Sequence, residues 1–279
     1  MRSLRWLAAL TAGLVLTGCA ADEPRTAGTR AAAHITVPEQ IRAKGTLVVG
    51  SDATYAPMEF MQNGELAGFD YELAGALAAR LGLKLDFRQT PWAELLDGIA
   101  GGRVDAVLSS VTDTAKRQAK VDFVDYLNVG SSIVVTGAVK GDGMAALCGY
   151  RLAVAKGTIY VDLAAAQNKR CPAGKKITMV EVDGPSDSRP IVEAGKADAY
   201  LDDFPPAALA TEQNPGLRLA GPQIEAAPYG IVLAKGSHLT EPIQQALYQV
   251  IDDGTYDKLL DKWKITEGAL RTGAVNGGA

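Results

Sequence analysis

Two successive series of alternating strand and helix patterns constrain what this chain can fold into more than any other feature. The first series has apolar strand patterns at residues 46–50, 83–87 and 104–108. Between the first two of these, apolar residues recur at a spacing of four from Phe69 to Leu81, which predicts an amphipathic helix. The second series has strand patterns at residues 152–155, 177–180 and 197–201, again separated by helical patterns. Strands that alternate with helices form mostly parallel sheets, so the sequence predicts an α/β fold with two such units.

The later part of the chain predicts how the two units are joined. A further strand pattern at residues 230–234 precedes two amphipathic helices, which need a core to cover. Residues 131–136 and 224–228 are the natural places for two crossings between the units. Ligands of open α/β sheets bind at the carboxyl ends of the strands, so two facing units would share one cleft.

The N-terminal segment predicts export and membrane attachment. Arg2 and Arg5 precede an apolar run that is too short to span a bilayer, so residues 1–18 are expected to be a signal peptide. Small residues then lead to Cys19, as at a lipoprotein cleavage site, and we expect Cys19 to become a lipid-modified N-terminus. An ordinary signal peptide with an incidental cysteine is the alternative. Residues 19–37 have no apolar period and predict a flexible tether, which places the protein outside the cytoplasm and on the cell membrane.

The remaining cysteines, the two histidines and the net charge exclude several classes of partner. Cys148 and Cys171 form an even pair in an oxidising compartment, so we expect a disulfide. Neither His34 nor His238 lies at ligand spacing from a cysteine, and we expect neither a metal site nor a cofactor. The formal charge is −4, and losing the two signal arginines makes it more negative, so nucleic acid is a poor partner.

One polar run suggests the chemistry of the expected cleft. The strand pattern at residues 104–108 leads into Ser109-Ser110-Val111-Thr112-Asp113-Thr114-Ala115-Lys116-Arg117. The planar fork of an arginine side chain matches a carboxylate, and nearby hydroxyl and backbone N–H groups can occupy the remaining lone pairs. The run therefore predicts a carboxylate-binding loop, and a polar loop with a surface arginine is the alternative.

Further motifs occur in a fixed order along the chain. They are Gly50-Ser51-Asp52-Ala53-Thr54-Tyr55-Ala56-Pro57-Met58-Glu59-Phe60, Gly64-Glu65-Leu66-Ala67-Gly68-Phe69-Asp70, Gly102-Arg103-Val104-Asp105-Ala106, Val121-Asp122-Phe123, Lys156-Gly157-Thr158, Lys196-Ala197-Asp198-Ala199 and Asp253-Gly254-Thr255-Tyr256. Over residues 38–266 the chain thereby resembles the bacterial extracellular solute-binding proteins of family 3, the polar amino-acid receptors of ABC importers.

The resemblance implies a periplasmic-binding-protein-like type II fold, with two α/β lobes joined by a two-strand hinge. The expected divisions are residues 38–130 and 228–266 for lobe 1, 131–227 for lobe 2 and 267–279 for a disordered tail. Such receptors are not enzymes. The protein is expected to be a monomer that closes over one L-amino acid and delivers it to the membrane subunits of an ABC permease.

The resemblance also implies roles for individual residues. Arg117 would bind the ligand α-carboxylate, helped by the hydroxyl residues of its run, Ser109, Ser110 and Thr112. Asp203, which follows an apolar strand, would hold the α-ammonium, and a helix N-cap is its alternative role. Thr158 would add a contact where a helix N-terminus favours an anion, with simple N-capping as the alternative.

Specificity is expected from two acidic and two aromatic residues, Asp52, Tyr55, Trp92 and Asp202. Tyr55 and Trp92 match positions where the family lays rings against the ligand side chain, although Trp92 could instead belong to a core. This set favours a cationic amino acid such as arginine, lysine, ornithine or histidine. Glutamine stays open, because an aspartate also accepts amide hydrogens.

Two other functions are compatible with the same fold. A sensory receptor would use the same pocket with a separate signalling partner, and a dehydratase-type enzyme would perform chemistry in it. The sequence offers little for catalysis, since the two later cysteines are expected to be bonded and neither histidine lies near a nucleophile.

Overall fold

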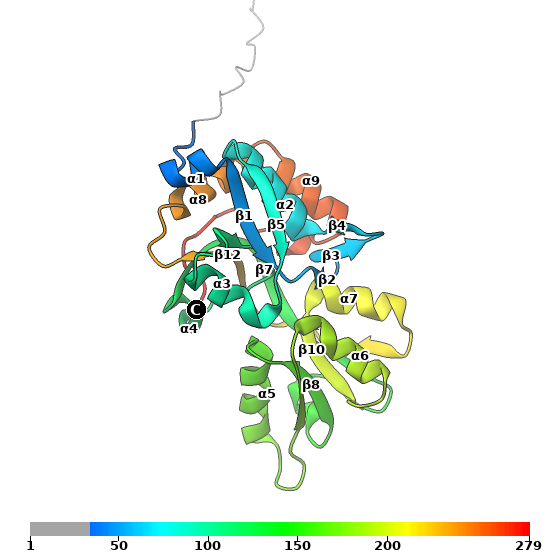
Figure 1. Cartoon of the computed structure of the whole chain (residues 1–279). Coiled ribbons are helices and arrows are strands. Elements are labelled where there is room, and N and C mark those ends of the chain that lie inside the picture. The colour runs from blue at the N-terminus through cyan, green and yellow to red at the C-terminus, as the bar shows by residue number, and fades with distance from the viewer. Residues whose placement is uncertain (1–33) are drawn as a thin grey trace, which may run out of the picture. The chain divides into compact units, whose positions relative to one another are not determined.

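One long mixed β-sheet organises the described part of the chain. The computed structural model describes residues 34–279, which form one unit. Within these residues the main sheet has the strand order β5-β1-β6-β12-β7-β10-β8-β9, and β11 pairs with β7 at the side (Figure 1). Its strands are β1 (Thr46–Ser51), β5 (Lys84–Gln89), β6 (Ala106–Val107), β7 (Val121–Thr136), β8 (Arg151–Ala155), β9 (Thr178–Val182), β10 (Ala199–Asp203), β11 (Leu217–Leu219) and β12 (Ile224–Ala234).

The middle of this sheet is antiparallel, and its two ends are parallel. β1 pairs in parallel with β5 and β6, and β8 pairs in parallel with β9 and β10. The long strands β7 and β12 pair antiparallel with each other and link the two ends. The expectation of mostly parallel strands therefore holds only at the ends of the sheet. β7 and β12 contain the two crossings expected at residues 131–136 and 224–228.

The first lobe surrounds the β5-β1-β6 end. Leu47 and Val49 of β1 face one hydrophobic cluster, whereas Val48 between them faces another, because successive side chains of a strand point to opposite faces. Its helices are α1 (Glu39–Lys44), α2 (Phe69–Arg80), α3 (Leu95–Ala100), α4 (Ala115–Gln118), α8 (Thr240–Asp252) and α9 (Thr255–Trp263). The predicted apolar face of α2 is buried against α8 and α9.

The second lobe surrounds the β10-β8-β9 end. Its helices are α5 (Ile159–Arg170), α6 (Ser188–Glu193) and α7 (Phe204–Gln213), and they pack on β7, β8 and β10 (Figure 1). The predicted disulfide is present: Cys148 and Cys171 are bonded, with 5.5 Å between their Cα atoms. This bond ties the C-terminal end of α5 to the segment that enters β8. The residue boundaries proposed for the lobes stay a prediction, since β7 and β12 run through the junction without a break.

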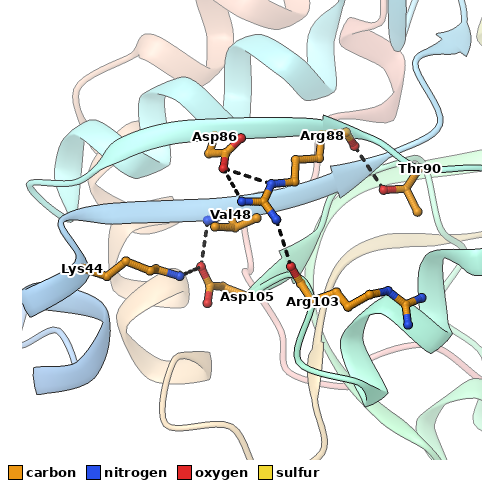
Figure 2. Close-up of polar contacts among 7 residues, drawn as sticks. All are labelled: Lys44, Val48, Asp86, Arg88, Thr90, Arg103 and Asp105. Atoms are coloured by element: carbon orange, nitrogen blue, oxygen red, sulfur yellow. Dashed lines mark hydrogen bonds and ion pairs between the residues drawn. The ribbon is translucent and has the colours of Figure 1, made fainter.

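Charged side chains hold the turn before β6 in the first lobe (Figure 2). Asp105, in the turn before β6, accepts hydrogen bonds from the Lys44 ammonium at 2.5 Å and from the Val48 N–H at 2.7 Å. Arg88 of β5 donates to the Arg103 carbonyl at 3.3 Å. These contacts hold the turn that leads into β6 and the polar run after it.

A small antiparallel sheet was not foreseen from the sequence. It consists of β2 (Thr54–Tyr55), β3 (Glu59–Gln62) and β4 (Glu65–Ala67), in that order. Strands of two to four residues are too short to show an alternating pattern. The sheet brings Tyr55 and Glu59 next to the carboxyl end of β1.

Both ends of the described region differ from expectation. The predicted tether overlaps it at residues 34–37, where Ile35 and Val37 are buried in the first core, so this part is not a tether. The predicted disordered tail is also wrong. Residues 274–276 lie along β7 and are held by hydrogen bonds to its backbone. The sequence of this segment has no apolar pattern that predicts such pairing.

The predicted signal peptide and Cys19 lie outside the described residues. Among residues 34–279, every helix is too short or too polar to cross a bilayer.

Candidate functional site

A small cavity lies where the carboxyl ends of β1, β6 and β10 meet the N-terminus of α5. Its volume is about 20 Å³. Its lining residues are Tyr55, Trp92, Ser109, Ser110, Thr112, Arg117, Thr158, Ile159, Tyr160, Pro185 and Asp203. This volume holds roughly one water molecule, so a ligand the size of an amino acid fits only after the lining groups move apart.

Arg117 spans the junction of the two lobes. Its guanidinium donates to the Thr112 carbonyl at 2.7 Å and to the Gly157 carbonyl of the second lobe at 3.0 Å. It also lies over the Trp92 ring, with 5.6 Å between Cζ and the ring centroid. Burial lowers the pKa of Arg117 from its ordinary value, but the group remains a cation. A ligand carboxylate could take over the donors that now bind carbonyl groups.

Two carboxyl groups, those of Glu59 and Asp70, accept hydrogen bonds from the serine pair after β6. The Ser109 hydroxyl donates to Glu59 Oε1 at 2.8 Å and accepts the Asp52 N–H at 3.0 Å. Ser110 has a φ of +50°, which is unusual for a residue with a side chain, and its N–H donates to Asp70 Oδ2 at 2.7 Å. The carboxylate of Asp70 thus stabilises a backbone turn that aims Ser110 at the cavity.

Glu59 and Asp70 form a buried acidic pair beneath the cavity, and the sequence motifs that contain them did not predict this position. Burial raises the pKa of Glu59 well above its usual range, and the nearby Asp70 charge raises it further. Burial also raises the pKa of Asp70, to about 6, although Tyr126 and Ser110 donate hydrogen bonds to it. Of the two, Glu59 therefore holds a proton more readily than Asp70 does.

Asp203 faces the cavity from the end of β10 and is surrounded by phenol groups. Tyr229 donates a hydrogen bond to Asp203 Oδ2, and Tyr55 lies 3.4 Å from the same oxygen. Burial raises the pKa of Asp203 to about 6, although hydrogen bonds from Tyr229, Tyr160 and Tyr55 and the charge of Arg117 oppose the shift. Its ionisation is therefore sensitive to any charge that enters the cavity.

Eight of the ten predicted binding residues line this cavity, and Asp52 and Asp202 do not. Asp52 accepts hydrogen bonds from the Trp92 N–H at 3.1 Å and from Thr54 and Gln89, which ties the end of β1 to the Trp92 turn. Asp202 accepts the hydroxyl of Tyr55 and lines a separate hollow. Both acids lie directly behind aromatic residues of the cavity.

Thr158 lines the cavity, but its hydroxyl is already engaged. It donates to the Ala155 carbonyl at 2.7 Å, and it makes no side-chain cap of α5. The hydroxyl oxygen can still accept a hydrogen bond from a ligand, whereas its proton is committed.

Three lining residues were not among the predicted binding residues: Ile159, Tyr160 and Pro185. Tyr160 lies in the first turn of α5, two residues after the predicted Thr158, so its position could have been inferred. Tyr229 does not line the cavity itself, but it contacts Asp203 from β12, and only the pairing of distant strands brings it there.

Several hydrogen bonds join the two lobes around the cavity. The Trp92 indole N–H donates to the Lys156 carbonyl at 3.2 Å, and the hydroxyls of Thr54 and Ser186 lie 2.7 Å apart. Together with the bond from Arg117 to the second lobe, these contacts hold the lobes closed around a very small space.

Comparison with known proteins agrees with this architecture. Residues 47–266 match the family model of the bacterial extracellular solute-binding proteins, family 3. The arginine-binding protein ArgT of Corynebacterium glutamicum is 29% identical over 250 residues, which cover 86% of this chain and 81% of that protein. The histidine-binding periplasmic protein of Salmonella typhimurium is 30% identical over 245 residues, covering 83% and 90% of the two chains.

A solved structure extends the comparison to the fold. The ancestral amino acid-binding protein AncCDT-1, described as a precursor of cyclohexadienyl dehydratase, matches with a TM-score of 0.72 and 33% identity. The match covers 80% of this chain and 97% of that one. The predicted family resemblance and the predicted fold class are confirmed.

The protonation of the acidic pair predicts unequal effects of two substitutions. Glu59→Gln replaces a neutral acid with a neutral amide of the same shape, so we expect the free energy of unfolding to change by less than about 1 kcal/mol. Asp70→Ala leaves the buried donors of Ser110 and Tyr126 unpaired and should lower it by about 2 kcal/mol or more. Urea unfolding at pH 7.5, followed by circular dichroism, measures both, and equal losses would contradict this assignment of the proton.

Proposed function

The chain belongs to the bacterial extracellular solute-binding proteins of family 3, and from this premise we propose that it binds a free L-amino acid in the cavity and delivers it to an ABC permease. The observation that carries the proposal is the pair of opposite charges at one cavity, Arg117 from the first lobe and Asp203 from the second. A zwitterion presents a carboxylate and an ammonium a few ångströms apart, which these two groups can hold at once.

The roles of the lining residues follow from their donors and acceptors. Arg117 would bind the ligand α-carboxylate in place of the carbonyls it now contacts, and Ser110 and Thr112 would add hydrogen bonds from the same loop. Asp203 would hold the α-ammonium, which has three N–H donors. Thr158 would accept one hydrogen bond from the second lobe.

The ligand side chain is proposed to be cationic. The Trp92 ring already carries the Arg117 guanidinium on its face, so this ring can accommodate a planar cation. Asp52 lies one residue layer behind Trp92 and favours positive charge there. Asp202 lies behind Tyr55, but burial raises its pKa well above the usual range and so weakens its electrostatic contribution. Arginine and histidine, after which two of the relatives are named, satisfy these conditions, and glutamine is the runner-up.

Ligand access is proposed to require separation of the lobes. A cavity of about 20 Å³ cannot admit an amino acid while Arg117 is bonded to Gly157 and Trp92 to Lys156. These bonds are few and partly exposed, so bending of β7 and β12 can break them at modest cost. A ligand that bridges Arg117 and Asp203 would then restore the closed form with more contacts than before.

A dehydratase is the second candidate, because one structural neighbour is described as a precursor of such an enzyme. Asp203, with a pKa of about 6, could act as a base near neutral pH. The sequence relatives, however, are named as binding proteins. Incubation of the protein with cyclohexadienyl compounds and with the amino acids below, followed by mass spectrometry, separates turnover from binding.

Binding should depend on Arg117 and not on its neighbour Lys116. Residues 20–279 are screened by thermal shift against the common amino acids, ornithine, citrulline and cystine, because a ligand of the native state raises the melting temperature. For a ligand that gives a shift, Arg117→Ala should raise the Kd about a hundredfold or more, since two charge-assisted hydrogen bonds are lost.

Lys116→Ala is the matched control. Its side chain is 82% exposed on the same short helix and makes a long contact, 3.5 Å, to Asp162. The variant should retain the Kd of the unmodified chain within about twofold. Unaltered binding by Arg117→Ala would refute the carboxylate assignment, and the absence of any shift in the panel would argue against amino-acid binding altogether.

The affinity should fall below pH 6. Asp203 has its pKa raised to about 6 by burial, so in acid the ligand ammonium must displace a proton from it. The Kd should be constant above about pH 7 and should rise by up to about tenfold per pH unit below pH 6. Titration calorimetry between pH 5 and 8 measures this slope.

The same shift has the opposite effect on the stability of the ligand-free protein. The pKa of Asp203 is about 6 in the folded state and about 3.9 in the unfolded state. The protonated group therefore stabilises the fold fully below about pH 3.9, and this contribution is lost as the pH rises through 6. The thermal shift caused by the ligand should therefore grow from pH 5 to pH 7.5. A flat Kd over this range would exclude Asp203 as the ammonium partner.

The receptor is further proposed to be held on the cell membrane through lipid on Cys19. When the full chain is expressed in a bacterium, Cys19→Ala should move it from the membrane fraction to the soluble extracytoplasmic fraction, because no acyl chains remain to anchor it. The control is Cys148→Ala, which keeps Cys19. Identical fractionation of the Cys19→Ala and unmodified proteins would rule out this anchor.

A further inference from the structure

The last six residues, 274–279, form a segment that we name the C-terminal strap. It lies beyond residue 266, where the family match ends. The strap first runs antiparallel to the start of β7. The Asp125 N–H donates to the Ala274 carbonyl at 2.8 Å, Val275 bridges to Val124, and the Asn276 N–H donates to the Phe123 carbonyl at 3.2 Å.

The strap then crosses to the loop and short helix that carry Arg117. The Gly278 N–H donates to Asp113 Oδ2 at 2.9 Å. The Gln118 side chain donates both to the Gly278 carbonyl and to Asp113 Oδ1, each at 2.9 Å. The Ala115 N–H donates to the Ala279 carbonyl at 3.3 Å. These contacts fix positions on both sides of Arg117 in the sequence.

Two buried carboxyl groups lie under the strap. Asp113 and Asp125 are 0% and 1% exposed, and they lie against each other. Burial, together with the neighbouring Asp113, raises the pKa of Asp125 to about 7. Buried carboxyl groups need hydrogen-bond donors, and the strap supplies the N–H of Gly277 to Asp125 and that of Gly278 to Asp113. Without the strap, both groups would need to reach water, which would displace the loop.

The direction of the Arg117 side chain depends on this loop. Thr112, whose carbonyl accepts one guanidinium hydrogen bond, directly precedes Asp113. Gln118, which contacts the strap, directly follows Arg117. A shift of this segment would move the guanidinium away from the Trp92 ring and from the Gly157 carbonyl.

We infer that the C-terminal strap positions Arg117 for the ligand carboxylate, through the contacts of Gly278 with Asp113 and Gln118. The strap itself does not touch the cavity. The inference rests on the proposed amino-acid binding for its functional consequence, but the positioning can be measured without any ligand.

The ligand-free experiment uses Trp92 fluorescence. The chain contains three tryptophans, so Trp6→Phe and Trp263→Phe in the full chain leave Trp92 as the sole emitter. Gly278→Ala should disrupt the strap, because its Cβ would lie 2.1 Å from the Asp113 carbonyl oxygen. We expect it to change the Trp92 emission in the same direction as Arg117→Ala, since both remove the guanidinium from the ring.

Two comparisons show whether the strap acts through Arg117. Gly137→Ala, whose Cβ would meet nothing within 4 Å, is the matched control and should leave the emission unchanged. In the Arg117→Ala background, Gly278→Ala should have no additional effect. If Gly278→Ala changes the emission equally with and without Arg117, or leaves it unchanged while Arg117→Ala alters it, the inference is wrong.

A second variant covers the case in which Gly278→Ala does not fold. Asn276→Ala removes the side-chain hydrogen bonds to the Phe123 N–H, at 2.9 Å, and to Asp122, at 3.0 Å, without adding a clash. It should produce a smaller emission change of the same direction. Circular dichroism and thermal unfolding confirm that each variant is folded, and no change in the folded Asn276→Ala protein would overturn the inference.

The functional arm measures the Kd of L-arginine and of L-histidine for the same variants. Gly278→Ala should raise the Kd about tenfold or more for whichever of the two binds, and Gly137→Ala should not. If neither amino acid binds the unmodified chain, the proposal of a cationic ligand is wrong, and the fluorescence experiment still tests whether the strap positions Arg117. If one binds and Gly278→Ala retains its affinity, the strap does not position Arg117 for ligand.

Discussion

The antiparallel pair of β7 and β12 is the element on which the rest of the structure depends. These two strands connect the lobes and make them part of one sheet. The hydrogen bonds between β7 and β12 also pair the backbone N–H and C=O groups where the chain passes from one lobe to the other. The pairing has register shifts between Ile224 and Ala227 and between Tyr229 and Gly230. Such irregularities weaken the ladder locally and bend it. The pairing is therefore continuous between the two ends of the sheet and irregular at two places along β12.

This arrangement places charged groups in a space that water hardly reaches. Arg117, Asp203 and the pair of Glu59 and Asp70 are each surrounded by hydroxyl or carbonyl partners, because an unpaired charge at such depth would be costly. The same environment strengthens the attraction of any opposite charge that enters. In the closed form the partners come from the protein, and a zwitterionic ligand could replace them with stronger, fully charged ones.

The predicted residues of the loop after β6 meet at the cavity for a local reason. Ser109, Ser110, Thr112 and Arg117 lie within nine positions of each other, directly after a strand, so the sequence itself keeps them together. Asp202 was predicted beside Asp203 but does not line the cavity. Asp202 and Asp203 are consecutive in β10, and consecutive side chains of a strand point to opposite faces, so only one of them can face the cavity. The alternation of the strand would have identified this conflict, although not which of the two acids lines the cavity.

Other parts of the site depend on contacts that no local pattern encodes. Asp70 stabilises the turn at Ser110 from 40 positions away in the sequence, and Tyr229 reaches Asp203 from a different strand. The C-terminal strap has polar and small residues typical of disorder, yet Gly278 is bonded to Asp113, 165 positions before it. Such bonds form only after the strands have paired, because the pairing brings the donor of one segment to the acceptor of the other.

The sequence by itself determined the α/β class, the order of most helices and strands, the cysteine pair and the polar loop that carries Arg117. These follow from apolar spacing and from residue chemistry, which act over a few positions. The tertiary structure alone decided which acids face the cavity, which carboxyl groups keep a proton and where the end of the chain is held. Those outcomes depend on burial and on partners from distant segments, and neither exists until the whole sheet has formed.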